Sequence, residues 1–308
     1  SSQLAGDITL TDGDAQNAAI GFLNGITLTG PVAMTTGSVA GGIYLSTVDA
    51  ATAGVQTLTL TAGTGDITFF DQVGGNQRLG DVVIYQAADV TIGTGSDDTF
   101  SATSFVQSDI TVGTGTFTLN ADLDTNAGVV TISSKQVDLD ASILTTAGYD
   151  TATTTDYGLV TINAGTDGLT LAPGATITTT TAPDSRVKSG AIDINADGDV
   201  VLEGDLVTTG AGDSAASGQG ATGGKVTIDT TGSATLSIAN ITTSGGAAQA
   251  LGGTGGTGGY AGEITLNTNT GVITLNSSII TAAGGLGATP EQQGTGANIT
   301  FSDAVMLA

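Results

Sequence analysis

The chain has 308 residues, of which 49 are glycine, and it contains neither cysteine nor histidine. Its 29 Asp and Glu residues outnumber its 5 Lys and Arg residues, so the net charge is −24 at pH 7. Disulfides, thiolate or imidazole metal sites and Ser-His-Asp catalysis are therefore excluded. The few basic residues exclude binding along a nucleic-acid backbone, and the short apolar runs exclude insertion of a helix into a membrane.

In chain order, the region 1–129 first shows short runs in which apolar and polar residues alternate. Such alternation predicts half-buried β-strands, and the Gly, Asn and Asp residues between the runs predict turns. We expect strands at 8–10, 26–28, 43–45, 58–60, 67–69, 82–84, 90–92, 110–112 and 117–119. Most Phe and Tyr residues lie in this less regular region, where we expect them to fill a wide core, and a loop at 71–79 interrupts the pattern.

Residues 130–308 repeat a pattern of three strands more regularly. The first strand of each unit is predicted at 130–132, 160–162, 192–194, 226–228, 264–266 and 299–301, so successive units start 30 to 38 residues apart. The second is predicted at 137–139, 169–171, 200–202, 234–236 and 272–275. The third is predicted around Ile143, Ile177, Leu206, Ile241 and Ile279, and a Gly- and Thr-rich stretch then closes the unit.

Strands this short cannot bury a hydrophobic face alone, so successive units must stack to build a core. We therefore predict an all-β fold: one continuous right-handed parallel β-helix over residues 1–308, with about ten coils of three short strands each. At about 4.8 Å per coil, the rod would be about 50 Å long. An antiparallel β-sandwich is the main alternative, but it needs hairpin turns at a shorter regular spacing.

One stretch, GVQTLTLTAGTGDITFFDQVGGNQRLGDVVIYQAADVTIGTG at residues 54–95, resembles the repeats of giant secreted bacterial surface proteins, the adhesins of the filamentous-haemagglutinin-like type. Residues 25–47 and 190–301 match the looser style of these repeats. The resemblance implies an extracellular β-helical shaft at the bacterial cell surface. It implies no catalytic residue and no cofactor.

A weak calcium motif lies at residues 193–198. Asp193, Asn195 and Asp197 match the first half of an EF-hand loop, but its twelfth position is Gly204, and Glu203 comes one residue early. The simpler interpretation is a turn at Asp197 and the glycine after it. Carboxylates on adjacent coils are a second, less specific place for calcium, and the densest are Asp12, Asp14, Asp97, Asp98, Asp122, Asp124, Asp138 and Asp140.

The Gly-rich stretches 210–224, 245–259 and 282–296 are the segments most variable between units. We interpret residues 252–262, which lack the Asp of calcium-binding Gly repeats, as a flexible surface loop. If a partner binds laterally, we expect it to contact these stretches; the alternative is that they are disordered insertions. The contact candidates are Gly210, Asp213, Gln219, Gln249, Tyr260 and Glu291.

The function predicted from these features is that of a non-enzymatic extracellular rod, structural and adhesive. No segment near either end of the sequence resembles a polar cap, so we expect the rod to continue in a longer shaft or copies to associate end to end. The expected partners are copies of the chain and a host or neighbouring-cell surface.

Two alternatives remain open. A polysaccharide-active β-helix enzyme needs two carboxylates about 5–9 Å apart, for which Asp138 and Asp140 are candidates, but no Trp is present to stack on sugars. An ice-binding solenoid needs two outward Thr columns. The first predicted column consists of Thr131, Thr161, Asp193, Thr227, Thr265 and Thr300. The second consists of Ser133, Asn163, Asn195, Asp229, Asn267 and Ser302.

Overall fold

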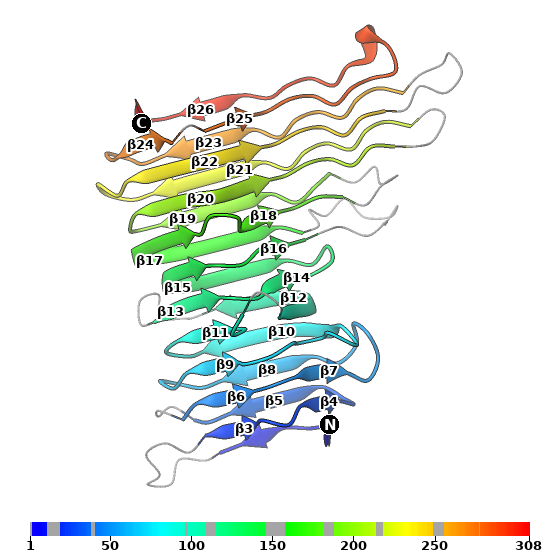
Figure 1. Ribbon diagram of the computed structural model, residues 1–308, viewed down its shortest axis with the longest axis vertical. Helices are drawn as coiled ribbons and strands as arrows, with labels where there is room; N and C mark the ends of the chain where they lie inside the picture. The colour runs from blue at the N-terminus through cyan, green and yellow to red at the C-terminus, as the bar shows by residue number, and fades with distance from the viewer. Residues whose placement is uncertain are drawn as a thin grey trace.

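The computed structural model describes residues 2–10, 19–37, 41–95, 98–108, 115–145, 158–181, 188–213, 218–248, 256–276 and 278–308. These residues form an elongated stack of short strands with the two chain ends at opposite ends of the stack (Figure 1). Every strand pairing within the described ranges is parallel, and η1 (Pro290–Gln292) is the one helical element there. The predicted all-β fold with parallel strands is therefore confirmed.

The strands lie in three parallel ladders, which the chain visits in a fixed order. Ladder A contains β2 (Ile8–Thr9), β5 (Val32–Thr35), β8 (Leu58–Thr61), β10 (Leu79–Gln86), β12 (Thr99–Ser108), β15 (Val130–Leu139), β17 (Val160–Leu171), β19 (Ile192–Ala196), β21 (Val226–Thr230), β23 (Ile264–Asn267) and β26 (Ile299–Phe301).

Ladder B contains β3 (Ile20–Phe22), β6 (Ile43–Leu45), β9 (Ile67–Phe69), β11 (Val90–Ile92), β13 (Thr116–Leu119), the second halves of β15 and β17, β20 (Val200–Val207), β22 (Leu236–Thr242), β24 (Val272–Leu275) and β27 (Ala304–Leu307). Ladder C contains β1 (Ser2–Leu4), β4 (Ile26–Leu28), β7 (Val48–Ala50), a bridge at Val73, the start of β12, β14 (Asp122–Asp124), β16 (Ile143–Leu144), β18 (Thr176–Thr178), the ends of β20 and β22, and β25 (Ile280–Thr281). We call one strand from each ladder a rung.

The register of ladder A agrees with the outward column predicted from the repeat. Thr131 pairs with Thr161, which pairs with Asp193, and the series continues through Thr227, Thr265 and Thr300. The series that starts at Ser133 is likewise paired as far as Asn267.

Two predicted strands are displaced by one or two residues. The strand expected at 234–236 begins at Leu236, whose partners are Val200 and Ile273. In the last unit Ile280, and not Ile279, pairs with Ile241, and Ile279 is 66% exposed. Because strand side chains alternate between faces, a shift of one residue moves a side chain from the core to the surface.

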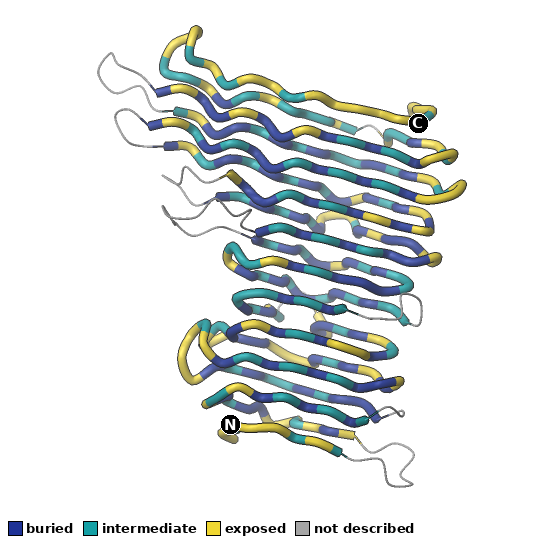
Figure 2. The backbone as a smooth tube through the Cα atoms, turned by 180° about the vertical axis from the view of Figure 1, so that it is seen from behind, coloured by how far each residue is buried: buried dark blue, intermediate teal, exposed yellow. Residues whose placement is uncertain are grey.

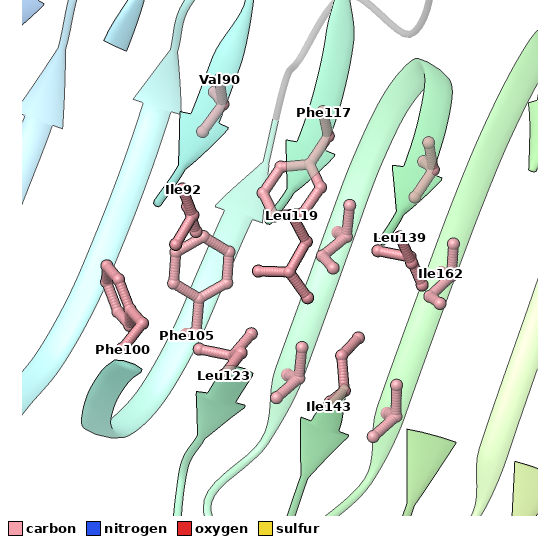
Figure 3. Packing of buried hydrophobic residues seen from close by; sticks show 14 of the residues in the cluster. Val90, Ile92, Phe100, Phe105, Phe117, Leu119, Leu123, Leu139, Ile143 and Ile162 are labelled. Atoms are coloured by element: carbon pink, nitrogen blue, oxygen red, sulfur yellow. The ribbon is translucent and has the colours of Figure 1, made fainter. Parts of the chain in front are cut away.

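The core lies between the ladders, since the apolar residues at both ends of each apolar–polar–apolar run point inward. They form one contiguous cluster that extends from Ile20 to Ile273 (Figure 2). The predicted aromatic residues are in the core: Phe69, Phe100, Phe105 and Phe117 are fully buried, and the first three meet edge to face with ring centroids 5.1 and 5.4 Å apart. Figure 3 shows Phe100, Phe105 and Phe117 among their apolar neighbours. Burial of such rings stabilises the N-terminal half without any disulfide.

Many corner aspartates have a structural role, because their carboxylates accept a backbone N–H from the next rung. Bonds of this kind join Asp7 to Ala33, Asp49 to Asn76, Asp89 to Thr116, Asp122 to Ser142 and Asp199 to Thr235, at 2.7–3.1 Å. Hydrogen bonds to a charged acceptor are about twice as strong as neutral ones. These five of the 29 acidic residues thus contribute to the stacking. Within the described part of the chain, no helix has the length and hydropathy needed to cross a membrane.

Candidate functional site

In the last rungs the chain leaves ladder C, extends sideways and returns to ladder A. The outgoing segments are 208–213, 243–248 and 281–288, and the returning segments are 218–225, 256–263 and 293–298. We call this set the glycine slab; it projects from the side of the stack (Figures 1 and 2). It contains the predicted partner-contact residues Gly210, Asp213, Gln219 and Tyr260, and Glu291 lies in η1 between its last two segments, so the slab is the candidate site.

A buried threonine fixes the base of each of the first two extensions. The hydroxyl of Thr208 donates to the O of Gly224 at 2.6 Å, and that of Thr243 donates to the O of Gly262. Thr179 makes the same bond one rung earlier, to Gly190 at 2.6 Å. All three threonines are completely buried. Each hydroxyl therefore ties the outgoing to the returning segment and satisfies a carbonyl that water cannot reach.

Backbone hydrogen bonds join the outgoing layer to the returning layer directly. The N–H of Gly246 donates to Ala221 at 2.8 Å, that of Gly259 donates to Gly246 at 2.9 Å, and that of Gly285 donates to Gly259 at 2.8 Å. Neighbouring N–H groups bond within a layer instead: Gly245 donates to Ala283 at 2.9 Å. Peptide groups that point in more than two directions are typical of a three-residue-per-turn extended chain and not of a β-strand.

The close approach of the two layers requires glycine. A Cβ atom on Gly220 would lie 1.8 Å from the O of Gly246, and one on Gly258 would lie 1.9 Å from the O of Gly285. Neither residue has a positive φ, so contact between backbones and not turn geometry selects glycine there. The slab interior thus consists of peptide groups. The expectation of a flexible surface loop at 252–262 is wrong for residues 256–262, which are bonded on both sides.

The exposed side chains of the slab lie on its outer faces, whereas the Asp213 carboxylate lies beside Gly218 of the returning segment. Tyr260 is 61% exposed, and Gln219 and Glu291 are exposed as well, so these three predicted contact residues lie on the surface. Gly210 is buried, and Asp213 is only 3% exposed. We therefore do not carry these two forward as contact residues. Gln249 lies outside the described residues.

A sequence signal for the slab exists in the triplet Gly-Gly-X of residues 252–259. This period of three differs from the period of two that marks strands. Sequence reasoning missed the role of Thr208 and Thr243, since buried and exposed threonines look alike in a Thr-rich chain.

The predicted calcium residues Asp193 and Asn195 lie on β19, and Asp197 lies in the bend that follows it. Each of them contacts or pairs with a residue of a neighbouring rung. Asp193 is paired between Thr161 and Thr227. The Asn195 amide donates to Asn163 Oδ1 at 3.1 Å, and Asp197 Oδ1 accepts from the Thr231 hydroxyl at 2.9 Å. In the described ranges, no group of three or more His, Cys, Asp or Glu side chains is placed to hold a metal ion. The placement agrees with the simpler interpretation of a turn.

Of the two carboxylates considered for sugar hydrolysis, Asp138 has a structural contact too. Both its oxygens accept from Gln136 Nε2, at 3.0 and 2.9 Å. The Lys135 ammonium lies 2.7 Å from the Asp167 carboxylate. Its hydrogen bond and charge lower the pKa of Asp167 below the ordinary value.

These features define the class of the molecule: an all-β protein of stacked parallel strands with a lateral layer of peptide groups. Comparison with protein-family models, with curated proteins and with solved structures gives no match to this chain. Its function is therefore argued from the geometry above.

Proposed function

We propose that the chain is a right-handed parallel β-helix of about ten coils that serves as a rod in an extracellular bacterial surface protein, with a mechanical and adhesive and not a catalytic role. The observation that carries the proposal is the set of three parallel ladders around one contiguous core. With about 4.8 Å between rungs, the ladders give a rod about 50 Å long.

The mechanical role is supported by how one rung is bonded to the next. Three kinds of interaction connect successive rungs along the long axis of the stack. They are the backbone hydrogen bonds of the three ladders, aspartate hydrogen bonds such as that of Asp89 to Thr116, and the aromatic stack. Each rung contacts only its neighbours, so stability sums along the rod and does not depend on one distant contact.

The adhesive role is supported by the glycine slab, which gives the rod a lateral surface outside its core. Tyr260 combines an apolar ring and a hydroxyl on an exposed face, which suits both sugar and protein partners. Gln219 and Glu291 add polar groups on exposed positions. The proposed partner is a host or neighbouring-cell surface.

The rod is tested by small-angle X-ray scattering and by digestion with a protease of broad specificity. An elongated particle that resists the protease at the ladders is the expected result, and a compact particle would reject the rod.

Adhesion is tested by binding of the fluorescent chain to bacterial and host cells. Tyr260→Ala should lower binding, and the matched control Tyr85→Ala should not, since Tyr85 is 50% exposed on β10, outside the slab. Equal loss in both variants, or no binding by the unmodified chain, would reject the adhesive role and leave the rod in place.

A further inference from the structure

The corner at which the chain passes from ladder C to ladder A is closed by the same hydrogen bond in five successive rungs. In each of them, the hydroxyl of a buried threonine just after the ladder C strand donates to the carbonyl of a glycine just before the ladder A strand. We call this bond the Thr–Gly latch. It joins Thr125 to Gly128, Thr145 to Gly158, Thr179 to Gly190, Thr208 to Gly224 and Thr243 to Gly262.

The neighbouring rungs hold both latch residues in place. Each of the five threonines donates its N–H to the last residue of the ladder C strand in the next rung, as Thr179 does to Val207 at 2.8 Å. On the other side of the corner the glycines approach one another closely: a Cβ atom on Gly224 would lie 1.9 Å from the O of Gly190. The two ends of the corner are therefore fixed by the stack, and the chain between them is not needed to position them.

The length of chain between the latch residues varies widely. The two residues are 3 positions apart in the first latch and 13, 11, 16 and 19 positions apart in the next four. At the turn from ladder B to ladder C, by contrast, the buried residues on the two sides stay close in sequence in all five rungs. These residues are Leu119 and Leu123, Leu139 and Ile143, Leu171 and Ile177, Leu202 and Leu206, and Ile238 and Ile241. One bond thus closes a tight turn in one rung and the base of the glycine slab in another.

The shortest latch shows the corner with almost nothing between its ends. The N–H of Gly128 donates to the O of Thr125 at 3.1 Å, so residues 125–128 form a tight turn. Its central residues, Asn126 and Ala127, have φ values of 46° and 89°, a region in which a side chain is strained. A longer segment would release both residues from that conformation, and the entropic cost of a loop rises only slowly with its length.

We infer that the corner from ladder C to ladder A is a built-in insertion site. The latch and the neighbouring rungs hold the ends of the corner, so a segment unrelated in length and sequence can be carried there while the three ladders stay unchanged. The glycine slab, which leaves the stack at this corner, is the longest described example (Figure 1). This property goes beyond the proposed function. Its use as the place where binding segments are exchanged rests on the proposed adhesive role.

The test inserts a foreign segment at the shortest latch. A short peptide epitope with Gly-Ser linkers is placed between Asn126 and Ala127 of the 308-residue chain. The matched control carries the same insertion between Asp140 and Ala141, in the turn from ladder B to ladder C, where no Thr–Gly latch is present among the described residues. Binding of the antibody to the epitope and hydrogen exchange of the β13, β15 and β17 amides are measured for both variants.

The two insertions should differ clearly. The variant with the insertion at the latch should bind the antibody and keep its ladder amides within about twofold of their exchange rates in the unmodified chain. The control should exchange at least about tenfold faster in the same strands, or fail to fold. Equal protection in both variants would overturn the inference, as would an insertion at the latch that exposes the ladders as much as the control does.

The role of the latch itself is tested by Thr125→Val, with and without the insertion. In the unmodified chain the N–H of Gly128 still closes the turn, so exchange at Val130 should change little. With the insertion present the latch holds the base of the new loop, and its loss should speed that exchange at least about tenfold. Equal effects in the two backgrounds would overturn the role given to the latch. None of these measurements involves cell binding, and a missing rod would leave the ladder amides of the unmodified chain unprotected, so failure of this inference and failure of the proposed function are distinguishable.

Discussion

Substitution of Gly246 by alanine is the most direct test of the glycine slab. The new methyl group would lie 1.8 Å from the O of Ala211, a backbone atom of the neighbouring outgoing segment that cannot rotate away, so Gly246 must shift. The shift breaks the bond from Gly246 to Ala221 and the bond from Gly259 to Gly246, which join the two layers. Each buried group left without a partner costs about 1–3 kcal/mol, so the loss expected for the two broken bonds is about 2–6 kcal/mol.

Hydrogen exchange measured by mass spectrometry reports this loss where it occurs. Because 1.36 kcal/mol corresponds to a factor of ten, amides in 243–248 and 256–263 should exchange about 30 to 25,000 times faster in Gly246→Ala. Amides of β8 and β10, far from the slab, should be unaffected, since each rung contacts only its neighbours.

The control is Gly212→Ala in the same slab. Gly212 is exposed, and its Cβ would lie 3.1 Å from the nearest atom, the O of Ala247, so a small shift accommodates it. Slab amides that remain as protected in Gly246→Ala as in the control would refute the close backbone contacts described for Gly246.

Three further results are expected. Thr208→Val removes the buried hydroxyl that closes one extension and should cost about 1–3 kcal/mol, measured by chemical denaturation. Phe105→Ala should cost about 3–5 kcal/mol in the same assay because it leaves a cavity in the aromatic stack, whereas Phe70→Ala, at a partly exposed ring, should cost clearly less. In a carboxyl NMR titration Asp167 should titrate below its ordinary pKa of 3.8, and Lys135→Met should remove that shift. The pair therefore stabilises the fold above the ordinary pKa of Asp167, and this contribution is lost as the pH falls through the lowered value.

The ladders could be predicted where both ends of a run are large and apolar. Ile67–Phe69 and Val90–Ile92 follow that pattern, and the structure places strands at those residues. The strands Val32–Thr35 and Asp122–Asp124 escaped prediction, because Ala33 fills the polar position of the first and Leu123 is the single apolar residue of the second. A period of two needs at least two contrasting positions to be visible.

The last rung shows why local sequence cannot fix register. Ile279 and Ile280 are adjacent and equally apolar, so alternation alone cannot say which points inward. Pairing with Ile241 one rung below decides for Ile280, and the N–H of Ile279 bonds to Asn240 Oδ1 at 2.9 Å instead. This information lies about forty residues away in the chain and becomes local only after stacking.

The sequence predicted where the candidate site lies, but not that it consists of hydrogen-bonded layers of backbone. Residues 256–262 contain four glycines and few apolar side chains. This composition indicates a flexible loop if burial of apolar side chains is taken as the only interaction that can order a segment. Tyr260 and Gln219 could be chosen as surface residues from their chemistry. Gly210 and Asp213 could not be excluded, because their burial arises from the facing layer.

Because few side chains lie between the layers of the slab, the slab can change in size without a change in the core of the molecule. A conventional domain that widens must add hydrocarbon in proportion to its volume. The slab can lengthen by triplets, two glycines for contact and one residue for the outer face, without adding anything insoluble to the chain. Its thickness then stays constant while the outward residues, such as Tyr260 and Thr257, are free to change. Such a surface can diversify in sequence between neighbouring rungs while the core that carries it stays the same.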